Sequence, residues 1–475
     1  MKEISLKDLI IEELHYEYKK AKGGLPKSFW ESYSAFANSD GGCIFLGVEE
    51  IKTRTYVPAQ LTSDEALDLK NQIFSLANNK EKVNVNLLSD EDIEEVLLEG
   101  FPVLCVRVKR CPRELRPIYI NCNIYQGTYR RNSDGDYHCD IEEINSMIRD
   151  SSIKATDLLL LDEYDISSLD LESIKEYKNI FSAMHPNHPF LSESNNRFLE
   201  YIGAARIDKN GEYHPTAAGL LMFGFSYRIV YEFPNYFLDY QLVNDENRWN
   251  DRIQSDSGDW SGNVFSFFKK VSLKLTNDVD VPFEMKGIYR IDDTELHKAI
   301  REALCNTLCN ADYHIKGEVI IKRYEDHITF INPGCLMMDI NQMIKGGESE
   351  ARNKTLLKMF NLIGIGERSG SGIPLIFNTA KNKMLPTPAI NEQFNPDKTV
   401  LTLFISKRVA KNKDDLSVLE KNIVNYVTSN GPCGAKEISV YLKKNITTVK
   451  LSLYHLVDLN ILKTSGTIKD KKYYR

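Results

Sequence analysis

Residues 33–48 read Tyr33-Ser34-Ala35-Phe36-Ala37-Asn38-Ser39-Asp40-Gly41-Gly42-Cys43-Ile44-Phe45-Leu46-Gly47-Val48. The first part continues a helical pattern that starts at about Pro26 and carries Trp, Tyr and Phe side chains. The Ser-Asp-Gly-Gly sequence predicts a tight turn, and the short apolar run after it, bounded by turn residues, predicts a buried strand. We therefore expect helix, glycine turn and strand as one unit, in a domain that mixes helices with a sheet.

Residues 1–150 form the first expected domain around this unit. The chain opens with a short helix-like stretch from about Leu6. Apolar patterns predict further strands at residues 83–88, 102–108 and 117–121. Acidic residues gather at about residues 89–99, where a solvated helix face is a sufficient explanation.

Two further regions follow. Residues 151–293 show a helical pattern at 169–184 and a strand pattern at about 236–242, but no residue set that indicates chemistry, so we expect a structural connector. Residues 294–410 begin with a helix to about Asp312 and continue with two alternating runs, 318–324 and 327–332, joined like a hairpin. A strand at 399–406 closes this region, which predicts a mixed α/β domain. The expected fold class is therefore α+β with several domains.

The composition of the whole chain is that of an ordinary folded protein. It has 475 residues, 42% hydrophobic and 27% charged, which predicts about three domains. Charged residues interrupt any apolar run near Met1, and no stretch is apolar enough to span a bilayer, so we expect a cytoplasmic protein with no membrane partner. The nine cysteines include no CxxC pair, which fits a reducing compartment.

Charge is unevenly distributed along the sequence. The formal net charge is −7, yet from Lys411 onward the chain carries 12 Lys/Arg against 6 Asp/Glu. Binding to nucleic acid depends on local potential rather than on the average charge. The C-terminal region, residues 411–475, is therefore the part whose charge fits a nucleic-acid partner.

The first candidate site combines acids with a lysine. Glu12 and Glu17 are five residues apart, Lys19 follows, and Glu50 comes directly after the predicted strand. Three carboxylates could hold a divalent cation that polarises a phosphodiester, with Lys19 offsetting phosphate charge. The alternative is an intramolecular salt-bridge cluster of the same acids with Lys19.

Three blocks of this region resemble the Schlafen AlbA-type domain. They are Glu12-x-x-x-x-Glu17-Tyr18-Lys19, the run Tyr33 to Gly42, and Phe45-Leu46-Gly47-Val48-Glu49-Glu50, with Gly127-Thr128-Tyr129-Arg130-Arg131 as the closing strand. The resemblance covers about residues 8–150 and implies nucleic-acid binding. In eukaryotic Schlafen ribonucleases the positions matching Glu12, Glu17 and Glu50 cleave structured RNA, which implies Mg²⁺ or Mn²⁺ as cofactor. Many bacterial relatives are described only as DNA-binding regulators. Glu50 stands where the usual residue is Asp, which lengthens the side chain by one carbon.

The second candidate site lies in residues 294–410. Glu302 and Asn306 are four apart on a predicted helix and share one face, where Glu could activate water and Asn could ligate the magnesium of a nucleotide. Glycines farther along the chain would let backbone N–H groups approach phosphate. The further candidate residues are Asn332, Gly334, Arg352, Asn353, Gly370 and Gly372. No GxxxxGK[ST] loop exists, so this is not a P-loop enzyme.

These blocks resemble the divergent ATPase-like domain of RecG-related proteins, itself similar to GHKL ATPases. The resemblance implies ATP as the ligand. Two departures stand out: Asn310-Ala311-Asp312-Tyr313 replaces the common His-Arg-Asp-Tyr, and Asn332 stands where a GHKL enzyme carries an adenine-reading Asp. The alternative is a glycine-rich turn that only shapes a dimer interface, and we expect a homo-oligomer.

The C-terminal region predicts a winged helix-turn-helix. Helical patterns cover residues 419–427, 435–443 and 447–459, with Asn445 as N-cap of the third, and a final hairpin would form the wing. Such a unit places its third helix in a major groove. Side chains near the start of that helix would meet phosphates or base edges: Lys443, Lys444, Thr447, Thr448 and Lys450. Winged helices also serve as protein–protein modules.

Together these patterns favour a DNA-binding transcriptional regulator with a nucleotide-sensing or oligomerising module. The alternative is a Schlafen-like metal-dependent endoribonuclease that cleaves tRNA or other RNA, acting in anti-phage defence. An ATP-driven helicase is disfavoured because no helicase motor sequence is visible.

Overall fold

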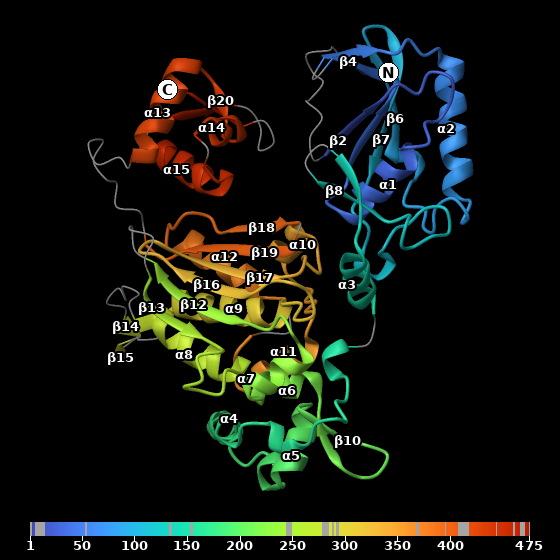
Figure 1. The fold of residues 1–475 in the computed structure, drawn as a ribbon. Helices are drawn as coiled ribbons and strands as arrows, with labels where there is room; N and C mark the ends of the chain where they lie inside the picture. The colour runs from blue at the N-terminus through green and yellow to red at the C-terminus, as the bar shows by residue number, and fades with distance from the viewer. Residues whose placement is uncertain are drawn as a thin grey trace. The chain divides into compact units, whose positions relative to one another are not determined.

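The computed structural model describes residues 2–4, 15–52, 55–132, 135–152, 155–243, 249–277, 285–286, 289–290, 294–366, 370–394, 396–406, 418–442, 444–458, 461–465 and 471–474. The chain divides into two compact units, Met1–Ile405 and Ser406–Arg475. The finer boundaries at residues 150 and 293 stay predictions. Helices and strands are mixed throughout, so the expected α+β class is confirmed (Figure 1).

A five-stranded sheet forms the N-terminal part of the first unit. Its strand order is β1 (Lys2–Ile4), β6 (Ile93–Leu98), β7 (Phe101–Val108), β3 (Gly42–Leu46) and β2 (Tyr16–Lys19). β1 runs parallel to β6 and β2 parallel to β3, while the other neighbours are antiparallel. α1 (Phe29–Asn38) and α2 (Ser63–Ala77) contribute to the core that covers one face of this sheet. The expected unit of helix, turn and strand is therefore confirmed.

Other expectations for this part were wrong. Residues 83–88 and 117–121 form only isolated bridges, such as Val83 with Ile120, rather than strands. The acidic stretch expected as a helix face contains β6 instead, in which Ile93, Val96 and Leu98 are buried while Glu94 is exposed. Tyr16–Lys19 is a strand, and the helix-like opening lies largely outside the described residues, since 5–14 are not described.

A second, six-stranded sheet holds the rest of the first unit together. Its order is β13 (Trp249–Gln254), β12 (Leu238–Val243), β16 (Val319–Arg323), β17 (His327–Pro333), β19 (Lys398–Phe404) and β18 (Ala389–Gln393). The expected hairpin of β16 and β17 is confirmed. β12 and β13 come from the connector, so the sheet draws strands from both sides of the boundary expected at 293/294.

Helices from the connector and from the ATPase-like region share one core with this sheet. α8 (Val264–Asn277) contacts β12, and α9 (Glu295–Asn310) contacts β17 and α12 (Gly372–Asn382) (Figure 1). The remaining helices of this part are α4 (Leu171–Met184), α5 (Asn195–Ile202), α6 (Ala217–Phe223), α7 (Ser226–Glu232), α10 (Ile340–Lys345) and α11 (Lys354–Leu362). A single large apolar cluster runs through both regions, which fixes α9 against the sheet.

The second unit contains three helices and a small sheet. They are α13 (Val418–Asn430), α14 (Ala435–Leu442) and α15 (Ile446–Asp458), with the strand order β20 (Cys433–Gly434), β22 (Lys472–Tyr474) and β21 (Lys463–Ser465). Its own core includes Ile438, Val449, Leu453 and Tyr473. In the part of the chain that the structure describes, no helix is both long and apolar enough to cross a bilayer.

Candidate functional site

Glu17 and Lys19 face the same side of β2, because alternate residues of a strand share a face. Their side chains form an ion pair, with Lys19 Nζ 2.8 Å from Glu17 Oε1. Lys19 Nζ also donates to Ser28 Oγ, 3.2 Å away, just before α1. Tyr16 and Tyr18 alternate with this pair and belong to a separate apolar cluster, so the pair points away from that cluster.

The second oxygen of Glu17 is also engaged. Arg131 donates from Nη1 to Glu17 Oε2 at 2.6 Å and to Asp136 Oδ1 at 2.9 Å, and its side chain is only 1% exposed. Burial alone would lower the pKa of Arg131, but Asp136 and Glu17 outweigh that effect and raise it. Glu17 is therefore a bridge between two cations of the N-terminal domain.

Glu50, unlike Glu17, is exposed to solvent. It stands on β4 (Val48–Lys52), which pairs with β5 (Thr55–Pro58), and is exposed. Glu12 lies outside the described residues. Within the described ranges, no three His, Cys, Asp or Glu side chains are grouped closely enough to hold a metal ion. The site of three glutamates and its metal stay a prediction.

Several residues of the second candidate site line one pocket. Glu302 and Asn306 come from α9, Asn332 from β17, and Gly370 and Gly372 from the start of α12. Asn306 Nδ2 lies 3.3 Å from Glu302 Oε1, so the two side chains share one helix face as expected. A Cβ on Gly372 would lie 2.1 Å from Glu302 Oε1, so a larger residue there would require the Glu302 side chain to shift.

The pocket is narrow. Its volume is about 90 Å³, whereas pockets that enclose small-molecule ligands measure roughly 300–1,000 Å³. Asn332 Nδ2 donates to the Pro333 carbonyl at 3.1 Å, so its amide is already engaged where a GHKL enzyme would present an acid to adenine. The Glu–Asn pair and the two glycines line this pocket together, and a nucleotide site there stays a prediction.

The other three candidates take structural positions next to this pocket. Gly334 has φ of +97°, and a Cβ there would lie 2.6 Å from Arg352 Nη1. Arg352 pairs through Nε and Nη2 with both oxygens of Asp150, at 2.8 and 2.7 Å. Asn353 Nδ2 donates to the carbonyls of Cys309 and Ala311. Arg352 and Asn353 instead line a neighbouring cavity.

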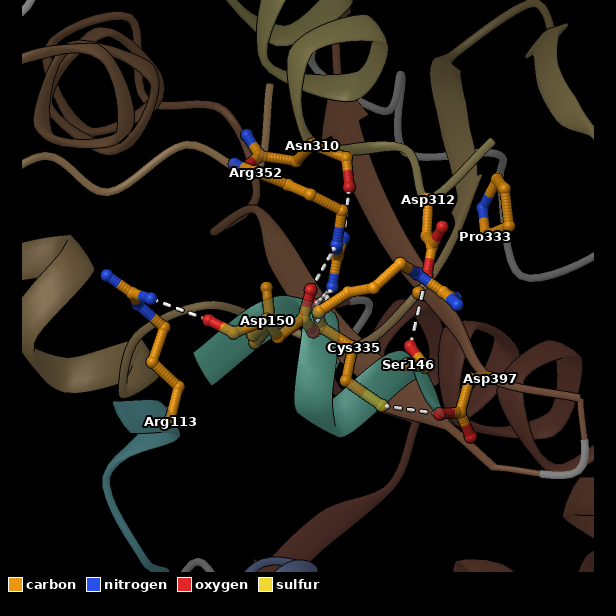
Figure 2. A network of polar contacts seen from close by, with 12 residues as sticks. Arg113, Ser146, Asp150, Asn310, Asp312, Pro333, Cys335, Arg352 and Asp397 are labelled. Carbon is orange, nitrogen blue, oxygen red and sulfur yellow. Dashed lines mark hydrogen bonds and ion pairs between the residues drawn. The ribbon is translucent and has the colours of Figure 1, made fainter. Parts of the chain in front are cut away.

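Sequence reasoning missed a network of ion pairs beside the pocket. Figure 2 shows part of its surroundings, with Arg113 near Asp150, Ser146 near Asp312 and Cys335 near Asp397. Arg113, Arg130 and Arg149 of the N-terminal domain contact Glu350, Asp397 and Asp312 in that order. Arg110 contacts Glu392 in the same way. The Arg130-Arg131 doublet was the one visible signal, since two adjacent arginines on a strand must point to opposite faces.

The third candidate site lies on the second unit. Asn445 Oδ1 accepts from Thr447 N at 2.8 Å, so the expected N-cap of α15 is confirmed. Lys444, Thr448 and Lys450 are exposed, and Thr447 is half-buried. Lys443 lies outside the described residues. The start of α15 thus presents two described lysines and one threonine to solvent.

Residues 12–140 match the family model described as "Schlafen, AlbA_2". The N-terminal domain is similar to the Schlafen AlbA domain. Residues 317–403 match the model "Putative ATP-dependent DNA helicase recG C-terminal", and residues 145–239 match a domain of unknown function. Both resemblances inferred from sequence motifs are therefore confirmed. Below, the AlbA-like domain means residues 1–150 and the ATPase-like module residues 294–405.

Solved structures provide two further comparisons. The DIP2311 protein from Corynebacterium diphtheriae is 16% identical over 94% of this chain and 90% of that one, with a TM-score of 0.42. The N-terminal domain of a "Putative ATP-dependent DNA Helicase RecG-related Protein" from Nitrosomonas europaea is 27% identical over 29% of this chain and 91% of that domain, with a TM-score of 0.22. No curated protein matches the chain. The family models identify a nucleic-acid-associated protein.

Proposed function

We propose that the chain is a DNA-binding transcriptional regulator. In this proposal the second unit contacts duplex DNA, the AlbA-like domain adds nucleic-acid contacts, and the ATPase-like module senses a nucleotide or organises a homo-oligomer. The observation that carries the proposal is the start of α15, where Lys444, Thr448 and Lys450 are exposed while Val449 is buried. A helix held from one side with cations on the other is suited to a DNA groove.

The order of elements in the second unit supports the same reading. α13, β20, α14, α15, β21 and β22 follow the order of a winged helix-turn-helix, with α15 in the place of the recognition helix. Lys471 lies over the ring of Tyr454 on α15, 4.8 Å from its centroid, and so brings a further cation to this helix. A protein–protein module would not need this concentration of lysines.

The environment of Glu17 favours binding over cleavage in the AlbA-like domain. Hard cations such as Mg²⁺ bind carboxylate oxygens directly, but Lys19 and Arg131 already engage both oxygens of Glu17. A metal there would have to displace a buried ion pair. The metal-dependent endoribonuclease is supported by the match of residues 12–140 to the Schlafen model, and we keep it as the alternative.

The test is binding and cleavage of labelled duplex DNA and labelled tRNA, with and without Mg²⁺ or Mn²⁺. For the regulator we expect DNA binding without cleavage. The double variant Lys444→Ala/Lys450→Ala should reduce the slope of log K against log salt by about 2, because each phosphate contact contributes about 0.9. Lys421→Ala/Lys436→Ala removes the same charge from exposed positions on α13 and α14 and should leave the slope unchanged. Metal-dependent tRNA cleavage would instead establish the endoribonuclease.

A further inference from the structure

The ion pairs between the AlbA-like domain and the ATPase-like module run mainly in one direction. Four arginines of the domain meet four carboxylates of the module: Arg110 with Glu392, Arg113 with Glu350, Arg130 with Asp397, and Arg149 with Asp312. The pair between Asp150 and Arg352 runs the other way. We call the set Arg110, Arg113, Arg116, Arg130 and Arg149 the arginine face.

One of these pairs has the geometry with which an arginine binds phosphate, because Arg110 meets the two oxygens of Glu392 through its two terminal nitrogens. Arg130 Nη1 lies 2.6 Å from both oxygens of Asp397, and Arg110 Nη2 lies 3.0 Å from Glu392 Oε1. The carboxylates are held out of water, with Glu392 at 3% and Asp397 at 6% side-chain exposure. A planar guanidinium recognises carboxylate and phosphate with the same fork of donors. The module thus presents to the arginine face the negative charge that a phosphate backbone would present, and at Arg110 it presents the two-oxygen geometry as well.

The arginine face also has donors left over. No ion pair of Arg116 is found among the described residues, and its buried Nε has no hydrogen-bond partner there. The Nε atom of Arg130 likewise has no hydrogen-bond partner there, whereas Arg113 Nε lies 3.4 Å from Glu114 Oε1. Arg113, Arg116 and Arg130 line one small cavity together with Asp150 and Asp397. Burial, and then the charges of Arg110 and Arg130, lower the pKa of Arg116. Arg116 is thus the one member of the face with no ion pair among the described residues, whereas Arg110, Arg113 and Arg130 also meet Asp40, Glu114 and Glu143 of their own domain.

We propose that the arginine face is a second binding surface for a nucleic-acid phosphate backbone, which the carboxylates of the ATPase-like module cover in this state. The proposal rests on the proposed function, since it needs a chain that binds nucleic acid. It goes further because it assigns a surface distinct from α15 and makes the module its competitor. Nucleic acid then binds there only when the module's acids are displaced.

The pocket lined by Glu302 and Asn306 lies where it could control the competition between nucleic acid and the module's acids for the arginine face. Glu350, which pairs with Arg113, lines the pocket, as does Leu336, whose N–H donates to Glu392 at 2.6 Å. If this pocket of about 90 Å³ widens for a nucleotide, Glu350 and Leu336 would move with its wall, and with them the contacts to Arg113 and Glu392. Occupancy of the pocket would therefore uncover the arginine face, and by reciprocity nucleic acid would favour occupancy.

The test neutralises the covering acids in the full-length chain. Glu350→Gln/Glu392→Gln keeps the size of both side chains and removes two charges. We expect affinity for labelled duplex DNA and tRNA at low salt to rise about tenfold, and the salt slope to steepen by about 2, as two arginines gain phosphates. Adding Arg110→Gln and Arg113→Gln should return the slope to that of the unmodified chain. Glu318→Gln/Glu325→Gln removes equal charge at exposed positions of the β16–β17 hairpin and should change little.

Each outcome decides the proposal. The arginine-face proposal is overturned if the unmodified chain and the Glu350→Gln/Glu392→Gln variant have equal salt slopes. It is also overturned if the control Glu318→Gln/Glu325→Gln changes the slope as much. Either result leaves the proposed function standing. Binding by the variant alone supports the arginine face and removes α15 as the contact. Absence of binding by both chains overturns both proposals. If the double variant fails to fold, the single change Glu350→Gln replaces it, because that side chain is 25% exposed. Comparing Glu350→Gln with and without Arg113→Gln then gives the same test with half the expected change in slope.

Discussion

At the scale of single residues, Glu17, which the sequence suggests as a catalytic carboxylate, lies in a bridge of two ion pairs. It joins Lys19 to Arg131, which come from strands far apart in the sequence, and Arg131 also donates to the carbonyl of Tyr16. The i, i+2 spacing of Glu17 and Lys19 was visible in the sequence. Arg131 was visible too, but its distance of 114 positions from Glu17 carries no local signal.

Glu17→Ala tests this bridge. We expect it to lower the free energy of unfolding by about 3 kcal/mol, because removing one partner of a buried pair leaves the other charge uncompensated. Glu50→Ala, at an exposed position, should stay within about 0.5 kcal/mol. Urea denaturation of both variants provides the measurement. If Glu17→Ala is as stable as Glu50→Ala but a metal-dependent RNA cleavage disappears, Glu17 is catalytic after all.

Asp312 gives a prediction about pH. Burial alone would raise its pKa, but Arg352 and Arg149 outweigh burial and hold the pKa below its ordinary value. A carboxyl with a depressed folded-state pKa stabilises the protein above its unfolded-state pKa, and this contribution is lost as pH falls through the folded-state pKa. Asp312→Asn should therefore cost about 1–3 kcal/mol at pH 7. The difference in the free energy of unfolding between Asp312→Asn and the unmodified chain should shrink as the pH falls below about 4. Urea denaturation of both chains at pH 7 and below pH 4 provides the measurement.

At the scale of elements, α11 shows that a helix cap can come from elsewhere in the chain. Its own N-cap residue, Asn353, makes no side-chain cap. Asp157, from the short turn at Thr156–Leu158, accepts instead from the N–H groups of Thr355 and Leu356 at 2.7 and 3.0 Å. The connector, which gave no chemical signal in the sequence, therefore holds one end of a helix in the ATPase-like module.

Asp157→Ala should reveal that role. We expect a loss of about 2 kcal/mol, at the upper end for a helix cap, since two donors become unsatisfied in a buried place. Asp339→Ala removes the cap of α10 at an exposed position, and should cost about 0.5–1 kcal/mol. Thermal unfolding of the two variants should rank them in this order. Equal losses would mean that Asp157 does not hold α11.

The elements also show where sequence patterns succeed. The helix α9 and the hairpin of β16 and β17 follow clear periodicities, and the pairing of Glu302 with Asn306 came with the helix. β6 was missed because its acids interrupt the apolar run and no simple alternation remains, since Ile93 packs in one apolar cluster while Val96 and Leu98 pack in another. The arginine face was missed for a different reason, since Arg130 and Asp397 are 267 positions apart and only tertiary folding joins them.

At the scale of the whole molecule, charge and structure divide the chain at the same place. Ser406–Arg475 is a compact unit with its own apolar core. It carries 14 Lys/Arg and 6 Asp/Glu, a net charge of +8, so the first 405 residues carry −15 of the total of −7. An electrostatic attraction to DNA should therefore reside mainly in the second unit.

Truncation after Ile405 tests this division. We expect the truncated chain to bind duplex DNA more weakly and with a flatter salt dependence, because the lysines at the start of α15 are removed. It should still give a cooperative thermal transition, since the large core of the first unit contains no residue of the second, and circular dichroism would check this. Adding Glu350→Gln/Glu392→Gln to the truncated chain should restore part of the affinity through the arginine face. An unchanged slope after truncation would show that the second unit does not contact DNA, whatever the arginine face does.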